Sequence, residues 1–224
     1  MDAGNYTGFH KALAQKIKAY LEPDDTLCDI GCGLGRLDFE IAPYVKGILA
    51  IDVSEYAIAK LQEDVERAGV GNIRAACGDA DELEGDFDVI LLSLFGRMDT
   101  YKLLKHCRRR LIRIVGAGSK SGLYPEAHRR ETKNAVPDIR SELSALGIDY
   151  RLEFCSFEFG QPLRTLKDAE SFVLSNAPEA GAEEIREFLD INMERTGRDD
   201  IPFYLPYRKE LGVFIIDKPR ETGA

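Results

Sequence analysis

The sequence predicts an α/β fold, in which a mostly parallel sheet of seven strands is covered by helices on both faces. Short apolar segments alternate along the chain with segments of helical periodicity, as in folds of this class. The first apolar segment ends in a glycine-rich turn, and residues 87–94 are almost continuously apolar, as in a central strand. A chain of 224 residues is long enough for one such domain with an insertion.

The glycine-rich turn follows the first predicted strand, in the sequence TLCDIGCGLGR of residues 26–36. A sharp turn from strand to helix needs positive φ angles or close approach of the backbone, and glycine allows both. Any Cβ would also block a ligand that lies across the loop. The turn is therefore predicted to seat a flat, polar cofactor at the carboxyl end of the first strand. The predicted cofactor-binding residues in this segment are Asp29, Gly31, Cys32, Gly33 and Gly35.

The second predicted strand, residues 47–51, ends at an acid, Asp52. An acid about 20 positions into such a unit can accept both hydroxyl protons of a ribose. Asp52 and the following Val53 are therefore predicted to bind the cofactor. The alternative is that Asp52 caps the next helix, although Ser54 is the better capping residue.

The other elements are predicted from periodicity and from start and stop signals. Residues 9–21 form an amphipathic helix that ends before Pro23, and Ser54 caps a second helix. Thr165 and Asp168 form a predicted capping box at the start of a later helix. The remaining predicted strands span residues 72–77, 87–94, 111–115, 150–159 and 211–217, and the remaining predicted helices span residues 99–110, 138–146 and about 182–196.

Four segments resemble, in this order, the motifs of the class I S-adenosylmethionine-dependent methyltransferase family: DIGCGLG, AIDVS, CGDADEL and FDVILLSLFG. The resemblance covers residues 12–115. It implies a Rossmann-like sheet whose last strand is antiparallel and lies between the fifth and sixth strands, and it implies S-adenosylmethionine as the cofactor. Asp29 suits this cofactor, because a carboxylate attracts a positive amino group and a sulfonium but repels a pyrophosphate.

The resemblance also implies roles at the ends of the third and fourth strands. Asp79 matches the acid that accepts the exocyclic amine of adenine, and Ala80 matches the neighbouring backbone amide; the alternative is a solvated acidic turn. Ser93 and Leu94 must face the cofactor. The segment SLFGR lacks the Asn-Pro-Pro-Tyr or Asp-Pro-Pro-Tyr motif of amino-group methyltransferases, which argues against adenine, cytosine or glutamine as the acceptor.

An insertion over residues 160–209 is predicted before the last strand, and the resemblance implies that it forms a helical lid over the methyl end of the cofactor. The alternative is a helical pair that packs on the edge of the sheet. The chain is then a single domain with an N-terminal cap helix (1–25), a core (26–159), the lid, and a final strand and tail (210–224). The candidate substrate-binding residues are Tyr6, Phe95, Phe203, Tyr204 and Tyr207.

Methyl transfer from a sulfonium is an in-line displacement, in which alignment and the exclusion of water matter most. A general base is needed where the acceptor is a hydroxyl of high pKa. His10 and His128 are the candidates for this base, and alignment alone would suffice for a thiol or a phenol. No spacing of His, Cys and carboxylate residues typical of a metal site occurs, so no metal is predicted.

The net charge of −9 disfavours a phosphate backbone as the partner. No apolar run could cross a bilayer and no signal peptide is recognisable, so a cytoplasmic protein without a membrane partner is expected. Five scattered cysteines do not suggest a disulfide framework. Together with the motifs, these features favour methyl transfer to a small molecule, at an oxygen or a small amine.

Three alternatives stay open. A nicotinamide-dependent oxidoreductase would share the glycine-rich turn, but it would have a glycine where this chain has Arg36. A nucleic-acid methyltransferase would use the basic cluster of residues 107–113, although cations near the end of a predicted helix also complement its dipole. A cofactor-binding regulator would bind the same ligand without turnover. The sequence does not specify an oligomeric state.

Overall fold

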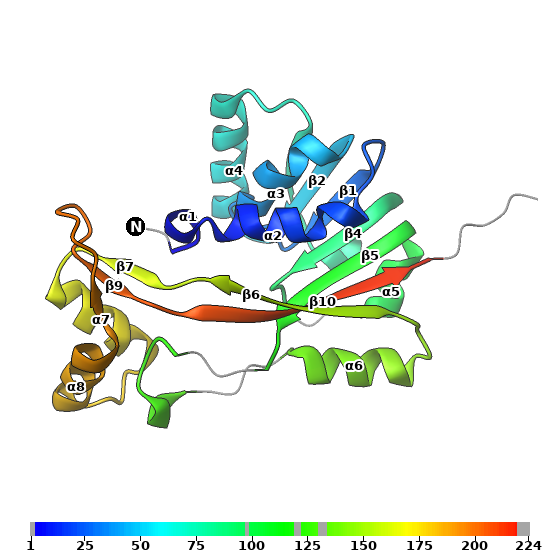
Figure 1. Cartoon of the computed structure of the whole chain (residues 1–224). Helices are drawn as coiled ribbons and strands as arrows, with labels where there is room; N and C mark the ends of the chain where they lie inside the picture. The colour runs from blue at the N-terminus through cyan, green and yellow to red at the C-terminus, as the bar shows by residue number, and fades with distance from the viewer. Residues whose placement is uncertain (1–2, 97–98, 119–121, 130–133, 219–224) are drawn as a thin grey trace, which may run out of the picture. The chain divides into compact units, whose positions relative to one another are not determined.

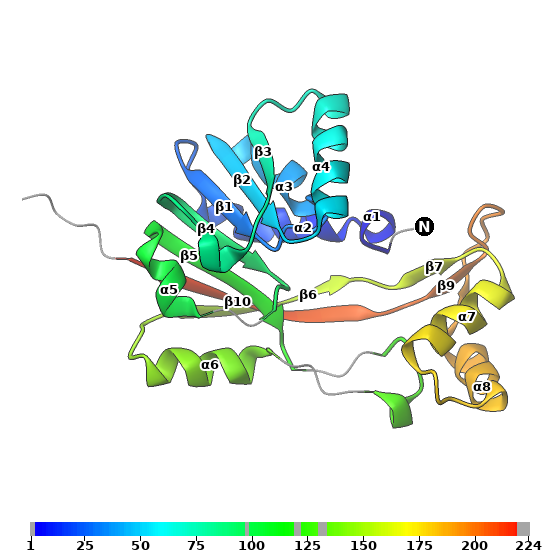
Figure 2. The same cartoon turned by 180° about the vertical axis from the view of Figure 1, so that it is seen from behind.

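The computed structural model describes residues 3–96, 99–118, 122–129 and 134–218. The chain divides into two compact units, whose elements are drawn in Figures 1 and 2. The larger unit comprises His10–Ala117, Asn134–Cys155 and Leu211–Ala224. The smaller unit comprises Met1–Phe9, Gly118–Lys133 and Ser156–Glu210.

The larger unit is built on a seven-stranded sheet with the strand order β3-β2-β1-β4-β5-β10-β6 (Figure 1). β1 is parallel to β2 and β4, β2 is parallel to β3, and β4 is parallel to β5, whereas β10 is antiparallel to β5. The predicted fold class is confirmed, including the antiparallel last strand and its place between β5 and β6. The strands span Thr26–Ile30 (β1), Gly47–Asp52 (β2), Ile73–Cys77 (β3), Phe87–Ser93 (β4), Cys107–Gly116 (β5), Arg151–Glu158 (β6) and Arg208–Asp217 (β10).

Helices cover both faces of this sheet, with α3 and α4 on one face and α5 and α6 on the other (Figures 1 and 2). Apolar side chains from the strands and from these helices fill the space between the layers, among them Cys28, Ile90 and Phe214, which are fully buried. Nowhere in the described ranges is a helix both long and apolar enough to cross a membrane. The α-helices before β6 span Ala3–Thr7 (α1), Phe9–Ile17 (α2), Arg36–Ile41 (α3), Glu55–Ala68 (α4), Thr100–Lys105 (α5) and Val136–Ala145 (α6).

The predicted helix over residues 99–110 is wrong in its second half. α5 ends at Lys105, and residues 107–110 belong to β5. This segment pairs with β4 on one side and with β10 on the other, where Arg110 lies opposite Asp217. Hydrogen bonding in the centre of a sheet therefore overrides the helical propensity of a basic run.

Besides α1, the described part of the smaller unit contains the helices α7 and α8 and a short three-stranded sheet of order β7-β9-β8. The predicted capping box is confirmed, because Thr165 and Asp168 exchange hydrogen bonds of 3.0 and 3.1 Å at the start of α7. The second helix ends earlier than predicted, at Asn192, because the chain then pairs with β9. The small sheet itself was not predicted. The elements span Gln161–Leu163 (β7), Leu166–Asn176 (α7), Ala182–Asn192 (α8), Glu194–Arg195 (β8) and Phe203–Leu205 (β9).

A buried ion pair joins β5 to α5 and α6 within the larger unit. Arg113 is 2% exposed, and its Nη1 donates to Thr100 Oγ1 at 2.9 Å and to Glu142 Oε2 at 3.0 Å. Glu142 also accepts a hydrogen bond from the Thr100 hydroxyl, at 2.6 Å. The carboxylate of Glu142 therefore compensates a cation that has no access to water.

We expect Glu142→Ala to lower the free energy of unfolding by about 3–5 kcal/mol, because it leaves a buried charge without its counter-ion. Urea denaturation followed by circular dichroism measures this difference. The matched control is Glu63→Ala, which breaks an exposed pair with Lys60 and should cost less than about 1 kcal/mol. Equal effects of the two substitutions would contradict the assigned role of Glu142.

Candidate functional site

The carboxyl ends of β1, β2, β3 and β4 lie at one edge of the sheet, because these four strands are parallel. Such an edge, where the strand order reverses between β1 and β4, is where open α/β sheets bind ligands. The structure places the predicted cofactor-binding residues in the elements that meet here. These residues are Asp29, Gly31, Cys32, Gly33, Gly35, Asp52, Val53, Asp79, Ala80, Ser93 and Leu94.

The three glycines of the β1–α3 loop have different physical roles, although all have positive φ angles between 55° and 75°. A Cβ on Gly31 would lie 1.9 Å from Cδ2 of Phe95, and a Cβ on Gly35 would lie 2.3 Å from Cδ1 of Leu61. A Cβ on Gly33 would meet no atom within 4 Å. Gly31 and Gly35 are therefore needed for packing, whereas Gly33 borders open space.

Asp52 fixes this loop from the end of β2. The backbone N–H of Gly33 donates to Asp52 Oδ2, and that of Ser54 donates to Asp52 Oδ1, both at 2.9 Å. Ser54, whose hydroxyl accepts from the N–H of Ala57, is the N-cap of α4, so Asp52 is not. Each carboxylate oxygen can accept a further hydrogen bond, which leaves Asp52 able to bind hydroxyl groups of a ligand.

The end of β4 carries a strained residue. Leu94 has a φ of +54°, and its backbone N–H donates to the carbonyl of Ile114 at 2.8 Å. Positive φ is unusual for a leucine, and residues in such conformations cluster at functional sites. The next residue, Phe95, was predicted to bind the substrate, and its ring lies against Gly31 of the glycine loop.

At the end of β3, Asp79 is exposed and caps a short 3-10 helix over Ala80–Glu82. Its Oδ1 accepts the backbone N–H of Asp81 at 2.9 Å. The neighbouring Val53 at the end of β2 is 66% exposed, which is unusual for a valine. An exposed apolar side chain and a carboxylate are the groups that an adenine ring and its amine would need.

The sequence analysis missed a buried acid pair beneath the glycine loop. Asp29 in β1 and Asp38 in α3 are 2% and 0% exposed. Burial raises the pKa of both carboxyl groups, and the nearby charge of Asp38 raises that of Asp29 further. Within the described residues, Asp29 Oδ1 and both oxygens of Asp38 are buried without a hydrogen-bond donor from another group.

A signal for Asp38 is present in the sequence. Leu37 and Ile41 lie on the apolar face of α3, and Asp38, three residues before Ile41, lies on the same face. An acid on the buried face of a helix is exceptional, because its charged form is costly to remove from water. Asp38 could therefore have been flagged as a candidate site residue.

Four of the candidate substrate-binding residues lie in the smaller unit. The rings of Tyr6 and Tyr204 are 5.4 Å apart between centroids, and the Tyr204 hydroxyl donates to Glu158 Oε1 at 2.5 Å. Burial, and then the hydrogen bond to Glu158, raises the pKa of the Tyr204 phenol. The ring of Phe203 lies 5.4 Å from the guanidinium of Arg195, and Tyr207 lies beside Gly122.

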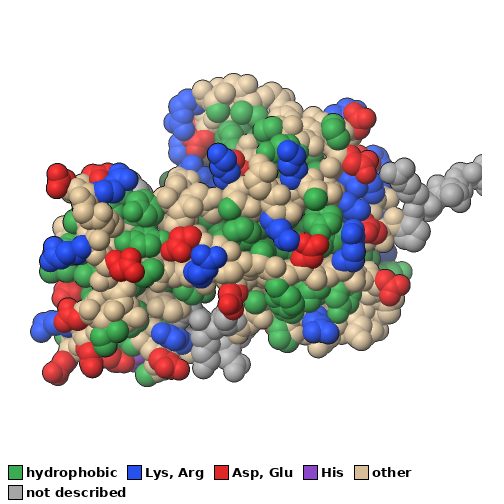
Figure 3. Space-filling model, viewed as in Figure 1, with side chains coloured by type: hydrophobic (Ala, Val, Ile, Leu, Met, Phe, Trp, Pro, Cys, Tyr) green, Lys and Arg blue, Asp and Glu red, His purple; other side chains and the backbone are tan. Residues whose placement is uncertain are grey.

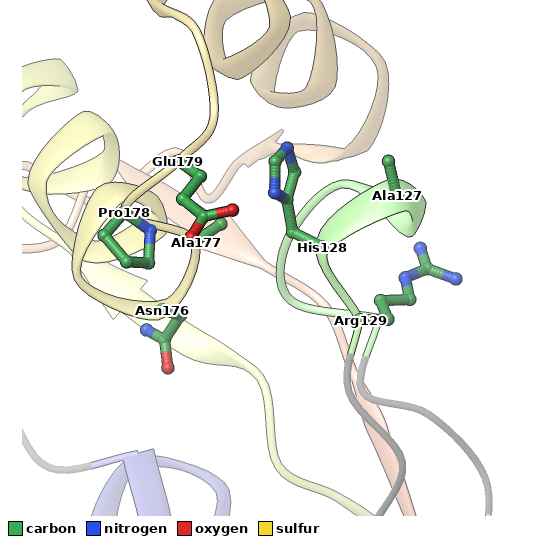
Figure 4. Close-up of a pocket in the computed structure, with 7 residues that line it drawn as sticks. All are labelled: Ala127, His128, Arg129, Asn176, Ala177, Pro178 and Glu179. Carbon is green, nitrogen blue, oxygen red and sulfur yellow. The ribbon is translucent and has the colours of Figure 1, made fainter.

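The two candidate bases belong to different units: His10 to the larger and His128 to the smaller. His128 Nε2 lies 3.1 Å from Glu184 Oε2 of α8. It lines a pocket of about 200 Å³ in the smaller unit, with Pro178 and Glu179 across from it (Figure 4). Neither histidine has been tested as a base, and both assignments stay predictions. Among the residues that the structure describes, no cluster of three or more His, Cys, Asp or Glu side chains could hold a metal ion.

The basic cluster of β5 is neutralised by acids of the larger unit. Besides Arg113, which pairs with Glu142, each of the three consecutive arginines contacts a carboxylate. Arg108 pairs with Asp88 at 3.8 Å, Arg109 with Glu22 at 3.2 Å and with Asp25, and Arg110 with Asp217 at 2.5 Å. These ion pairs account for the cluster without a phosphate ligand.

The protein has an α/β fold, with the glycine loop at the carboxyl edge of its sheet. Residues 27–113 match the methyltransferase domain family. This segment is therefore a methyltransferase domain of the class I, S-adenosylmethionine-dependent type.

Similar proteins act on different acceptors. A ribosomal RNA small subunit methyltransferase A of Moorella thermoacetica is 37% identical over 90 residues, which are 38% of this chain and 30% of that protein. A probable cobalt-precorrin-6B C(15)-methyltransferase of Methanococcus maripaludis is 30% identical over 102 residues, which are 46% of this chain and 56% of that protein. The chain thus spans less than two thirds of the length of these relatives.

The fold is also similar to that of magnesium protoporphyrin IX methyltransferase from Synechocystis, whose structure was solved with bound S-adenosylmethionine. The TM-score is 0.52 at 18% identity, and the similarity covers 92% of this chain and 79% of that one. At this identity the likeness concerns the fold alone. Because it covers 92% of the chain, the likeness extends beyond the segment that matches the domain family.

We expect Gly31→Ala to destabilise the protein by about 2–4 kcal/mol, because it combines a positive φ with a clash against Phe95. Gly33 also has a positive φ, but a Cβ there meets no other atom, so Gly33→Ala should lower the free energy of unfolding by about 1 kcal/mol. Chemical denaturation of both variants measures the difference. A larger loss for Gly33→Ala would contradict the packing described for the loop.

We expect Asp38→Asn to stabilise the protein at pH 7 by about 1–3 kcal/mol, because the amide cannot ionise and so avoids the cost of a buried charge. A carboxyl whose folded pKa is raised destabilises the fold increasingly as pH rises from the unfolded pKa, about 3.9, towards the folded pKa. The gain should therefore vanish near pH 4. Thermal unfolding of both proteins over pH 4–8 gives this profile, and a gain independent of pH would count against the burial of an ionisable pair.

Proposed function

We propose that this protein transfers the methyl group of S-adenosylmethionine to a small-molecule acceptor, at an oxygen or a small amine. The observation that carries the proposal is the open space beside Gly33, in a loop that Asp52 fixes by a hydrogen bond at the carboxyl edge of a methyltransferase domain. The remaining lone pairs of the Asp52 carboxylate would accept the two ribose hydroxyls. The acid pair of Asp29 and Asp38 would attract the positive amino group of the donor.

The reacting carbon of this donor is already activated, so the protein has to align the acceptor and exclude water. Val53 and Asp79 would flank the adenine ring, and Ser93 and Leu94 would face the cofactor from the end of β4. The aromatic residues Tyr6, Phe203, Tyr204 and Tyr207 would contribute the acceptor pocket, with residues 160–209 as its lid. His10 or His128 would serve as a base for an acceptor of high pKa.

A small acceptor is supported by the charge distribution. The arginines of β5 are paired with acids, and on the face shown in Figure 3 basic and acidic side chains are interspersed rather than gathered into a basic field. Binding to a phosphate backbone depends on such a field. The net charge of the whole chain, −9, points the same way.

RNA is the second candidate acceptor, because one relative with 37% identity is a ribosomal RNA methyltransferase. The identity is confined to 38% of this chain and overlaps the cofactor-binding domain, so it does not select between acceptors. Incubation with labelled methyl donor and a cell extract separates the two. Label in a low-molecular-weight product supports the proposal, whereas label that nuclease treatment releases from RNA would contradict it.

We expect wild-type protein to bind S-adenosylmethionine in isothermal titration and not NADH. Asp52→Ala should weaken donor binding by about 1–3 kcal/mol, roughly 5–150-fold, because it strands the ribose hydroxyls. The control is Asp64→Ala, which changes an acid of α4 that pairs with Lys60 and Arg67. Binding of NADH alone, or unchanged donor affinity in Asp52→Ala, would refute the assigned cofactor site.

A further inference from the structure

The pocket beside His128 lies entirely within the smaller unit, and the proposed reaction assigns no ligand to it. Its volume of about 200 Å³ is below the range of about 300–1,000 Å³ that holds drug-sized ligands, so it suits a small molecule. Residues 127–129 form one wall, at the end of a short 3-10 helix. Residues 176–179 form the other wall, at the end of α7 and in the turn that follows it.

His128 leaves one ring nitrogen for a ligand. Its Nε2 lies 3.1 Å from Glu184 Oε2 on α8. Because a carboxylate only accepts, the neutral imidazole carries its hydrogen on Nε2, and Nδ1 becomes an acceptor. Among the residues that the structure describes, Nδ1 has no hydrogen-bond partner. Figure 4 shows the Glu179 side chain facing this ring across the pocket.

The Glu179 carboxylate is the second group that a ligand can use. Glu179 is exposed, and no cation of the described residues forms an ion pair with it. Arg129 also lines the pocket, but its Nε donates to the carbonyl of Tyr124 at 3.2 Å, and its guanidinium points away from Glu179 (Figure 4). α7 ends at Asn176, and the C-terminal end of a helix carries a partial negative charge. A cationic donor would therefore complement this pocket, whereas an anion would be repelled.

We propose that this pocket binds the primary ammonium group of a small molecule, between the Glu179 carboxylate and Nδ1 of His128. An ammonium has three N–H donors, so it can donate to both acceptors, and its charge compensates that of Glu179. Glu184 does not contact the ligand but selects the tautomer of His128, and it is a positioning residue. The inference goes beyond the proposed function, because this site needs no methyl donor and involves no covalent step.

The lining residues also distinguish between kinds of cation. A quaternary ammonium has no N–H group and is bound by the faces of aromatic rings. The described walls of this pocket contain no Phe, Tyr or Trp. The two facing acceptors instead favour a cation that donates hydrogen bonds.

The test is an NMR titration of the full-length wild-type protein with propylammonium chloride at about pH 8. An alkylammonium is charged at this pH, since its pKa is close to that of lysine, about 10.4. We expect saturable shifts of the backbone amide signals of residues 127–129, 176, 177 and 179. The control ligands are 1-propanol, which has no charge, and tetramethylammonium chloride, which has the charge but no N–H. Neither control should give saturable shifts at these residues.

The tautomer of His128 gives a second measurement on wild-type protein. The ¹⁵N chemical shifts of its ring should show the hydrogen on Nε2 in the free protein, and the Nδ1 signal should move when propylammonium binds. A hydrogen on Nδ1 in the free protein would overturn the proposal, because that nitrogen could not accept a hydrogen bond.

Glu179→Gln keeps the size of the side chain and removes its charge. It should weaken propylammonium binding by about tenfold or more, as expected for the loss of a hydrogen bond between charged groups. The matched control is Glu183→Gln, which changes an exposed acid in the first turn of α8 and should bind as wild type does.

Three further results would overturn the inference: no saturable shift at the pocket with propylammonium, equal shifts with either control ligand, or unchanged affinity in Glu179→Gln. The first two use only wild-type protein and need no variant to fold. None of them bears on the proposed methyl transfer, which titration with the methyl donor tests separately.

Discussion

The hydrogen bond from the backbone N–H of Gly33 to Asp52 is the constraint on which the site depends. The loop between β1 and α3 contains three residues in left-handed conformation, and a chain of this kind has many alternative paths. The backbone N–H groups of Gly31 and Cys32 donate to the carbonyl of Ile51. The N–H group of Gly33 donates to the side-chain carboxylate of the next residue, Asp52. The end of β2 thus selects one path, and this path leaves Gly33 beside open space.

The part of the fold that could be predicted is the part with local signals. The glycine turn, the Ser54 cap and the capping box of α7 are each encoded within a few residues, and the structure has them where they were expected. The strand order needed the resemblance to a known family, because periodicity finds strands but does not say which ones pair. The register between β5 and β10 is a long-range property of this kind.

The errors have one physical cause, which is that pairing between distant segments decides the local conformation. The local sequence of residues 107–110 favours a helix, but the segment forms a strand because it pairs with β4 and β10. β8 has two residues and β7 and β9 have three each, too few for a period to be visible.

Asp29 and Asp38 also bear on what the site is for. A fold gains nothing from two buried acids without donors, because each charged form is destabilised. Local features that oppose stability are concentrated where a ligand is bound. The candidate acceptor residue Tyr204, with its partner Glu158, lies in the smaller unit and outside the matched domain, which ends at residue 113. The match to the methyltransferase domain family ends at residue 113, so it bears on the proposed donor site and does not bear on the choice of acceptor.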